Sequence, residues 1–219
     1  VALSALRALL DMADPAAAAA LAAQRHTASG QDGWRTLAAL FHLGAKDPAA
    51  ALQVLPTPQD CRRHDAVLGL CAAIGAAQPV APWRSRLDEV HQALAAQDPP
   101  AALPLEYRVL LALAAGDGGA ADQLVREEQV GAADGTILRA VTATAEVRPR
   151  AAEAASLLCV RLARELGFGP WAGRWALEML RVRPTCQWAA VAALRGDGIP
   201  PASVLETLRP PDCLLARAV

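Results

Sequence analysis

The stretch LLDMADPAAAAALAA (residues 9–23) sets an Asp-Pro pair between two apolar runs, and LFHLGAKDPAAALQVL (residues 40–55) repeats the arrangement. Proline suits the first turn of a helix because its missing N–H would be unpaired there and its φ is already helical. An aspartate before it can cap the free N–H groups of that turn. Each stretch therefore predicts a turn between two helices, with Pro15 and Pro48 beginning the second helix.

Comparable pairs recur along the chain at Asp14-Pro15, Asp47-Pro48, Gln78-Pro79, Asp117-Gly118 and Arg148-Pro149, with 31 to 39 residues from one pair to the next. An alanine stands three positions after the first member of each pair, at Ala17, Ala50, Ala81, Ala120 and Ala151. A small residue one turn into the second helix is expected to let the two helices of a hairpin approach closely. Since a single hairpin cannot bury its apolar face alone, the repetition predicts a solenoid.

The composition predicts an all-α fold. Alanine, the best helix former, is the most frequent residue, whereas the aromatic residues that favour strands make up only 4% of the chain. The abundance of alanine and arginine, with Lys46 the only lysine, is typical of a GC-rich genome. The pattern of apolar runs and breakers predicts helices over 2–13, 15–28, 33–44, 48–55, 62–77, 82–97, 104–115, 119–129, 134–146, 149–166, 169–182, 186–195 and 200–208, with a short one after Asp212.

The domain organisation is predicted from the register of the pairs. They keep their spacing as far as residue 166, and the next comparable joint, Gly196-Asp197-Gly198, is out of register. No long polar segment divides the chain, so one continuous domain is expected. Residues 1–166 are expected to form the hairpins and residues 167–219 an irregular helical cap or a continuation of the same domain.

The segment from Trp34 to Leu55 resembles a tetratricopeptide repeat (TPR), with the pattern residues Trp34, Leu37, Ala38, Phe41, Ala50 and Val54. The next unit keeps Leu68, Gly69 and Ala81 but has Asp65 at the aromatic position, and the fourth keeps Ala120 and Leu124. The resemblance implies a right-handed superhelix of about five antiparallel hairpins. It also implies a concave groove, lined by the first helix of each hairpin, that holds a peptide or a partner helix.

The sequence favours a non-catalytic scaffold or adaptor that binds a protein or peptide. A net charge of −1 provides no field for nucleic acid or a membrane surface, and no uninterrupted apolar run of about 18 residues occurs. Five scattered cysteines without a C-x-x-C motif indicate a reducing compartment, hence the cytoplasm. An alternative is a regulatory or docking helical domain of a larger enzyme or ATP-dependent regulator, since the chain begins at Val1 without methionine.

No motif predicts a catalytic residue, a cofactor or a metal site. Cys61 and His64 have the spacing of metal ligands, but a structural zinc site needs four ligands and no second pair is near. The glycine-rich segments 116–122 and 196–201 lack the lysine and Ser/Thr of a phosphate-binding loop and are expected to be turns. His26, His42 and His91 are isolated.

A local excess of positive charge marks the candidate partner-binding region. Between Arg139 and Arg183 there are eight arginines and four glutamates, and Trp171 and Trp175 share a helix face. The candidate residues are Arg161, Arg164, Arg174, Arg181, Trp171 and Trp175, which would suit an acidic peptide or a phosphate-rich partner. The alternative is a solubilising surface with pairs such as Arg161–Glu165, and tryptophans that pack between hairpins.

Overall fold

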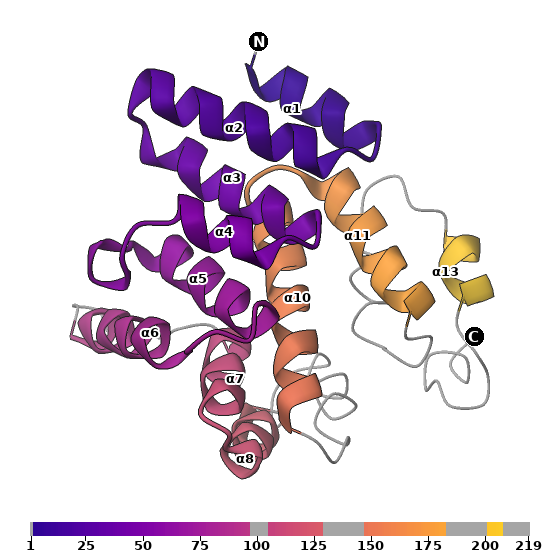
Figure 1. Ribbon diagram of the computed structural model, residues 1–219. Helices are drawn as coiled ribbons and strands as arrows, with labels where there is room; N and C mark the ends of the chain where they lie inside the picture. The colour runs from indigo at the N-terminus through magenta and orange to yellow at the C-terminus, as the bar shows by residue number, and fades with distance from the viewer. Residues whose placement is uncertain (1, 97–104, 129–146, 183–200, 208–219) are drawn as a thin grey trace. The chain divides into compact units, whose positions relative to one another are not determined.

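The computed structural model describes residues 2–96, 105–128, 147–182 and 201–207 (Figure 1). These residues form eleven α-helices and one 3₁₀ helix, and no strand occurs among them, which confirms the all-α prediction. The chain divides into two compact units, residues 1–117 and residues 118–219. Residue 166, where the hairpins were predicted to give way to a cap or a continuation, lies inside the second unit, between two helices that pack against each other.

Most predicted helices are present with ends shifted by a few residues. Unit 1 contains α1 (Ala2–Asp11), α2 (Pro15–Ser29), α3 (Asp32–Gly44), α4 (Pro48–Val54), the 3₁₀ helix η1 (Pro58–Asp60), α5 (Arg63–Gly75), α6 (Ala81–Ala95) and α7 (Leu105–Ala114). Unit 2 contains α8 (Gly118–Glu128), α10 (Val147–Glu165), α11 (Gly169–Val182) and α13 (Pro201–Thr207). The helices expected over 134–146, 186–195 and after Asp212, and the joint at 196–198, lie outside the described residues.

The turns at Asp14-Pro15 and Asp47-Pro48 have the same geometry. Asp14 has φ −113° and ψ 73°, and Asp47 has φ −114° and ψ 75°. The Oδ1 atom of each accepts a hydrogen bond of 2.9 Å from the backbone N–H three residues later, in Ala17 and Ala50. Each turn is therefore the side-chain cap that the Asp-Pro pair predicts, and the proline supplies the first helical residue.

A residue in the left-handed region precedes each turn and ends the helix before it. Its N–H bonds the carbonyl three residues back, and the next N–H bonds the carbonyl five residues back, a pattern that closes the free carbonyls of a helix end. This occurs at Ala13, Lys46, Ala77, Gly116 and Gly167, where φ lies between 54° and 87°. The fifth turn is thus Phe168-Gly169, between α10 and α11. Pro149 does lie in the first turn of α10, but the residues before Val147 are outside those described.

The close-packed alanine lies one position later than the sequence suggested. Ala18, Ala51, Ala121 and Ala172, four residues after the start of their turns, are fully buried, whereas Ala17 and Ala50 are half-buried and Ala81 is exposed. The residue three positions after the capping aspartate donates its N–H to the carboxylate. The next residue is turned by a further 100° or so around the helix axis, toward the interior. Only Ala151, of the predicted positions, is buried.

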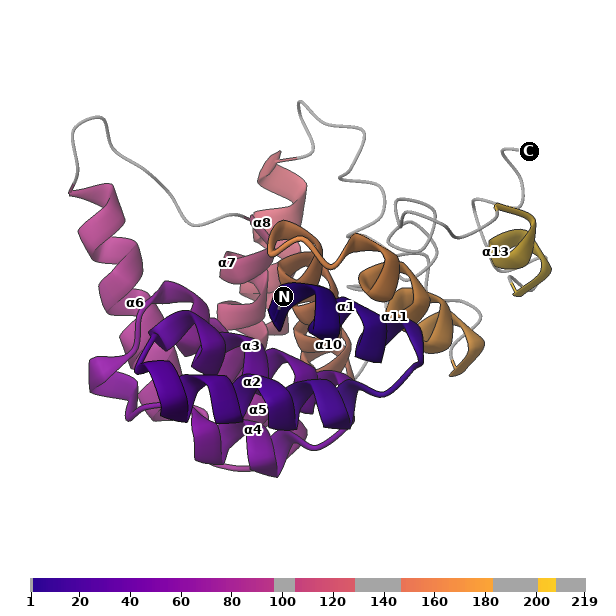
Figure 2. The same ribbon diagram turned by 90° about the horizontal axis from the view of Figure 1, so that it is seen from above.

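Helices of unit 1 pack in chain order. Each contacts the next from α1 to α7, and α3 additionally contacts α5 (Figures 1 and 2). The core between them contains Leu6, Leu10, Leu40, Phe41 and Leu68, all with almost no exposed surface. Burying a side chain of this size stabilises the fold by about 1.5–3 kcal/mol, so this apolar contact is the main force that holds successive helices together.

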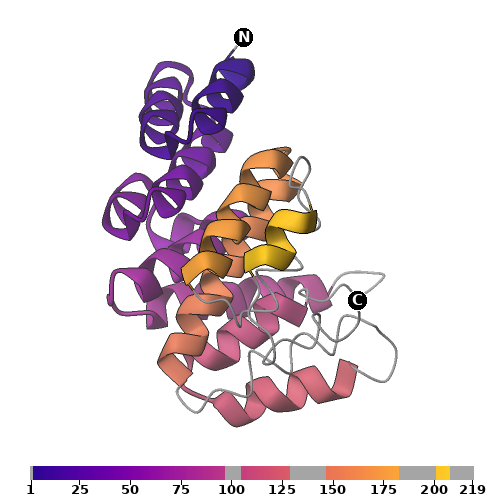
Figure 3. The same ribbon diagram turned by 90° about the vertical axis from the view of Figure 1, so that its right-hand side faces the viewer.

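In unit 2, α11 lies between α10 and α13 and contacts both (Figure 3). The glycine and alanine residues of α11, Gly169, Ala172, Gly173 and Ala176, are buried together with Leu177 and Leu180. In addition, Asp122 of α8 and Arg150 of α10 form an ion pair, with 2.7 Å between Oδ1 and Nη2. Arg150 is almost completely buried, so this pair links the N-terminal halves of α8 and α10.

Candidate functional site

The predicted partner-binding residues lie on α10 and α11. Trp171 and Trp175 are on the same face of α11, with ring centroids 5.0 Å apart and planes tilted by 34°. Both tryptophans are buried, with exposed fractions of 7% and 8%. Stacked and buried rings contribute apolar area to packing. Little of the surface of either ring is therefore available to a partner.

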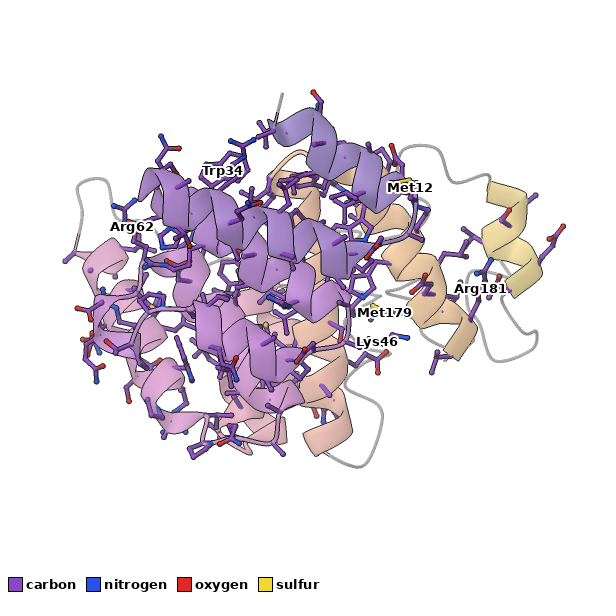
Figure 4. All side chains as sticks on the ribbon, turned by 45° about the horizontal axis from the view of Figure 1, so that its top comes forward. Met12, Trp34, Lys46, Arg62, Met179 and Arg181 are labelled. Atoms are coloured by element: carbon purple, nitrogen blue, oxygen red, sulfur yellow. The ribbon has the colours of Figure 1, made fainter. Side chains whose placement is uncertain are left out.

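The four arginines are divided between the two helices. Arg161 and Arg164 are half-buried on α10, and the Nε of Arg161 donates to Glu165 on the same helix at 2.8 Å. Arg174 is half-buried on α11, and Arg181 is exposed at its end (Figure 4). A half-exposed pair within one helix contributes only a few tenths of a kcal/mol. Their role in binding an acidic partner stays a prediction.

A polar cluster that the sequence did not reveal joins the first turns of α3 and α5. Asp65 of α5 is almost completely buried, and its Oδ1 accepts a 2.6 Å hydrogen bond from the hydroxyl of Thr36 on α3. The Nη2 of Arg35 lies 3.8 Å from the other oxygen of Asp65 and 3.2 Å from Asp32. The buried carboxylate is thereby compensated by one hydroxyl and one guanidinium, as a buried charge requires.

The outer edge of this cluster is formed by Arg62, which lies near the same end of unit 1 as Trp34 (Figure 4). Its Nη2 lies 3.4 Å from Asp32, but its side chain is 81% exposed. An ion pair so open to water contributes little. The chemistry of the cluster is thus ion pairing between two helices, with Asp65 and Thr36 as its buried centre.

Cys61 and His64 frame the start of α5. Cys61 is buried, and its thiol lies 3.7 Å from the carbonyl oxygen of Pro56. Burial, with the charge of Asp65 as the second cause, raises the pKa of this thiol to about 12. A thiol so rarely ionised is a poor nucleophile and a poor metal ligand, since both roles need the thiolate. Among the described residues, no three His, Cys, Asp or Glu side chains come together in an arrangement that could hold a metal.

Arg86 of α6 binds the backbone of the segment that leads into α5. Its Nε and Nη2 donate to the carbonyl oxygen of Cys61 at 3.0 and 2.9 Å, and its Nη1 pairs with Glu89 at 2.8 Å. A two-pronged guanidinium contact fixes both distance and direction. The connection between α4 and α5 is therefore fastened to α6.

The remaining polar groups of interest lie apart from one another. Burial lowers the pKa of His42, while the nearby Asp47 acts in the opposite direction. The Nδ1 of His26 lies 3.0 Å from the carbonyl oxygen of Gln31. The cysteines that the structure describes, Cys61, Cys71 and Cys159, are buried and not in disulfides.

No protein family, no curated protein and no solved structure matches this chain. Of the helices that the structure describes, none has the length and apolar character needed to cross a bilayer.

Proposed function

We propose that the chain is a TPR-like array of helix hairpins, wound as a right-handed superhelix, that binds a peptide or a partner helix and performs no catalysis. The observation that carries this proposal is the repeated turn. Asp14-Pro15 and Asp47-Pro48 have the same dihedral angles and the same capping bond, each after a left-handed residue. The chain-order contacts of unit 1, and the contact of α3 with α5, are those expected where the first helices of successive hairpins stack.

The TPR-like pattern residues support the same proposal. Ala38 and Phe41 of α3 are fully buried, and Gly69 of α5 is buried against the ring of Trp83. Trp34 and Leu37 are half-buried. Two of the small pattern residues, Ala38 and Gly69, are therefore buried between helices, whereas the two large apolar side chains of α3 keep part of their surface in solvent.

The surface best suited to a partner is the α3 face, which we define as Gly33, Trp34 and Leu37. Leu37 follows Gly33 by four residues and Trp34 by three, so both are its neighbours on the surface of the helix. Gly33 is exposed, and a β-carbon added there meets nothing within 4 Å. Tryptophan is among the residues that contribute most to protein interfaces. As α3 is the first helix of its hairpin, this face would line the groove.

Two of the second helices, α2 and α4, offer a contrasting surface. The exposed residues of α4 are Ala49 and Gln53, and α4 carries no charge; those of α2 are mainly alanine, Gln24, Arg25 and Thr27. Apart from Arg25, these exposed side chains are neutral, and the alanines among them provide little apolar area and no side-chain hydrogen bond. This surface therefore serves as the matched control for the α3 face.

A photo-cross-linking residue tests the proposal in the full-length protein in its own cells. It replaces Gly33 on the α3 face, Gln53 on α4 as the control, or Arg181 on α11 as the predicted edge. A partner captured at 33 but not at 53 supports the groove. Capture at 181 alone would place binding on the α11 edge, and equal capture at 33 and 53 would overturn the proposal. A cross-link within the same polypeptide would favour a docking domain.

Affinity for the captured partner provides the second measurement. Gly33→Trp fills the α3 face without disturbing the packing behind it, so we expect the dissociation constant to rise by about tenfold or more, equal to 1.4 kcal/mol. Gln53→Trp should leave the affinity within about twofold. An unchanged affinity of the Gly33→Trp variant would exclude this face.

A further inference from the structure

We draw no further inference here: the strongest candidate, the side-chain cluster of Asp32, Arg35, Thr36 and Asp65 that joins the first turns of α3 and α5, belongs to the site already described, and its charged groups face one another and not an open position for a ligand.

Discussion

The six-membered ring of Trp83 lies directly over Gly69, in the place that a side chain at residue 69 would occupy. The ring comes from α6 and the glycine from the middle of α5, and both are buried. A β-carbon on Gly69 would overlap three ring carbons, Cε3, Cζ3 and Cδ2. Gly69 is thus required for the close approach of the two helices and not for an unusual backbone.

Gly69→Ala is therefore expected to lower the free energy of unfolding by about 1–3 kcal/mol, because the added methyl forces Trp83 and α6 to move. Urea titration followed by circular dichroism measures the effect. Gly33→Ala is the matched control, since a β-carbon there meets open space. In that variant we expect stability to be unchanged or to rise by up to about 1 kcal/mol. The same substitution in a Trp83→Leu background tests the role of the ring. If Gly69→Ala then lowers the free energy of unfolding no more than Gly33→Ala does, the ring is the cause. An equal loss of stability with and without the ring refutes this explanation.

The cap at Asp47 gives the second prediction. Asp47→Ala removes the acceptor of the Ala50 N–H and should cost about 0.5–2 kcal/mol, whereas Asp47→Asn keeps an acceptor and should cost much less. Thermal unfolding of both variants checks this order. Asp88→Ala, at an exposed position on α6, controls for the loss of one negative charge. Equal losses for the alanine and asparagine variants would show that charge and not the cap is responsible.

The turns show which part of the fold was predictable. Asp14-Pro15 and Asp47-Pro48 are determined by residues within one turn of each other, so the sequence alone predicts both the break and the helix start. The break between α10 and α11 was also predicted, with helices expected over 149–166 and 169–182, but it was not recognised as one of the repeated turns because Phe168-Gly169 is not an Asp-Pro pair. The buried alanine was placed one residue early, since the residue that faces the interior depends on how the neighbouring helices pack, which spacing does not specify.

The hydrogen bond from Thr36 to Asp65 gives the third prediction. Thr36→Val keeps the shape of the side chain and removes the donor, leaving a buried carboxylate with one partner fewer. We expect the free energy of unfolding to fall by about 1.5–3 kcal/mol, the range for hydrogen bonds to charged groups. Thr36→Ser keeps the hydroxyl and should retain most of this stability. In an Asp65→Ala background the effect of Thr36→Val should shrink to a small fraction. Strict additivity of the two substitutions would mean that the two side chains do not interact.

The cluster around Asp65 is the part of the candidate site that could not be predicted from the sequence. Asp65 stands where the TPR-like pattern has an aromatic residue, and every residue of α5 after it is apolar or glycine; that departure was the only local signal. Its partner Thr36 is 29 residues away and has no feature that identifies it. Pairing of this kind depends on how α3 and α5 are stacked, which periodicity does not specify.

The Cys61 thiol gives the fourth prediction. Its pKa rises from 9.0 to about 12 on folding, chiefly by burial. In the unfolded chain the thiol therefore loses its proton first, so between those pH values the unfolded state binds fewer protons and stability falls as pH rises. Below about pH 9 the stabilising contribution is fully present. Between about pH 9 and pH 12, the free energy of unfolding should fall less in Cys61→Ala than in the unsubstituted protein. Urea titrations at several pH values measure this difference.

The reactivity of the same thiol provides an independent check. At about pH 8 iodoacetamide should label Cys61 only as fast as the surrounding structure opens, because the folded thiol is almost wholly protonated and out of reach. Mass spectrometry of the labelled peptide measures this rate. Rapid labelling in the absence of denaturant would show that the thiol is accessible and contradict the assigned pKa.

The chain-order packing of unit 1 also determines how its folding is distributed along the chain. Most helix contacts there join neighbours in sequence, so they close short loops and cost little chain entropy. Low contact order of this kind allows structure to begin at several hairpins and to spread from one to the next. It also means that a helix at one end can detach while those beyond its neighbour stay folded. Each helix of this unit is therefore stabilised mainly by its neighbours in sequence, and a local unfolding event spreads from one helix to the next along the chain.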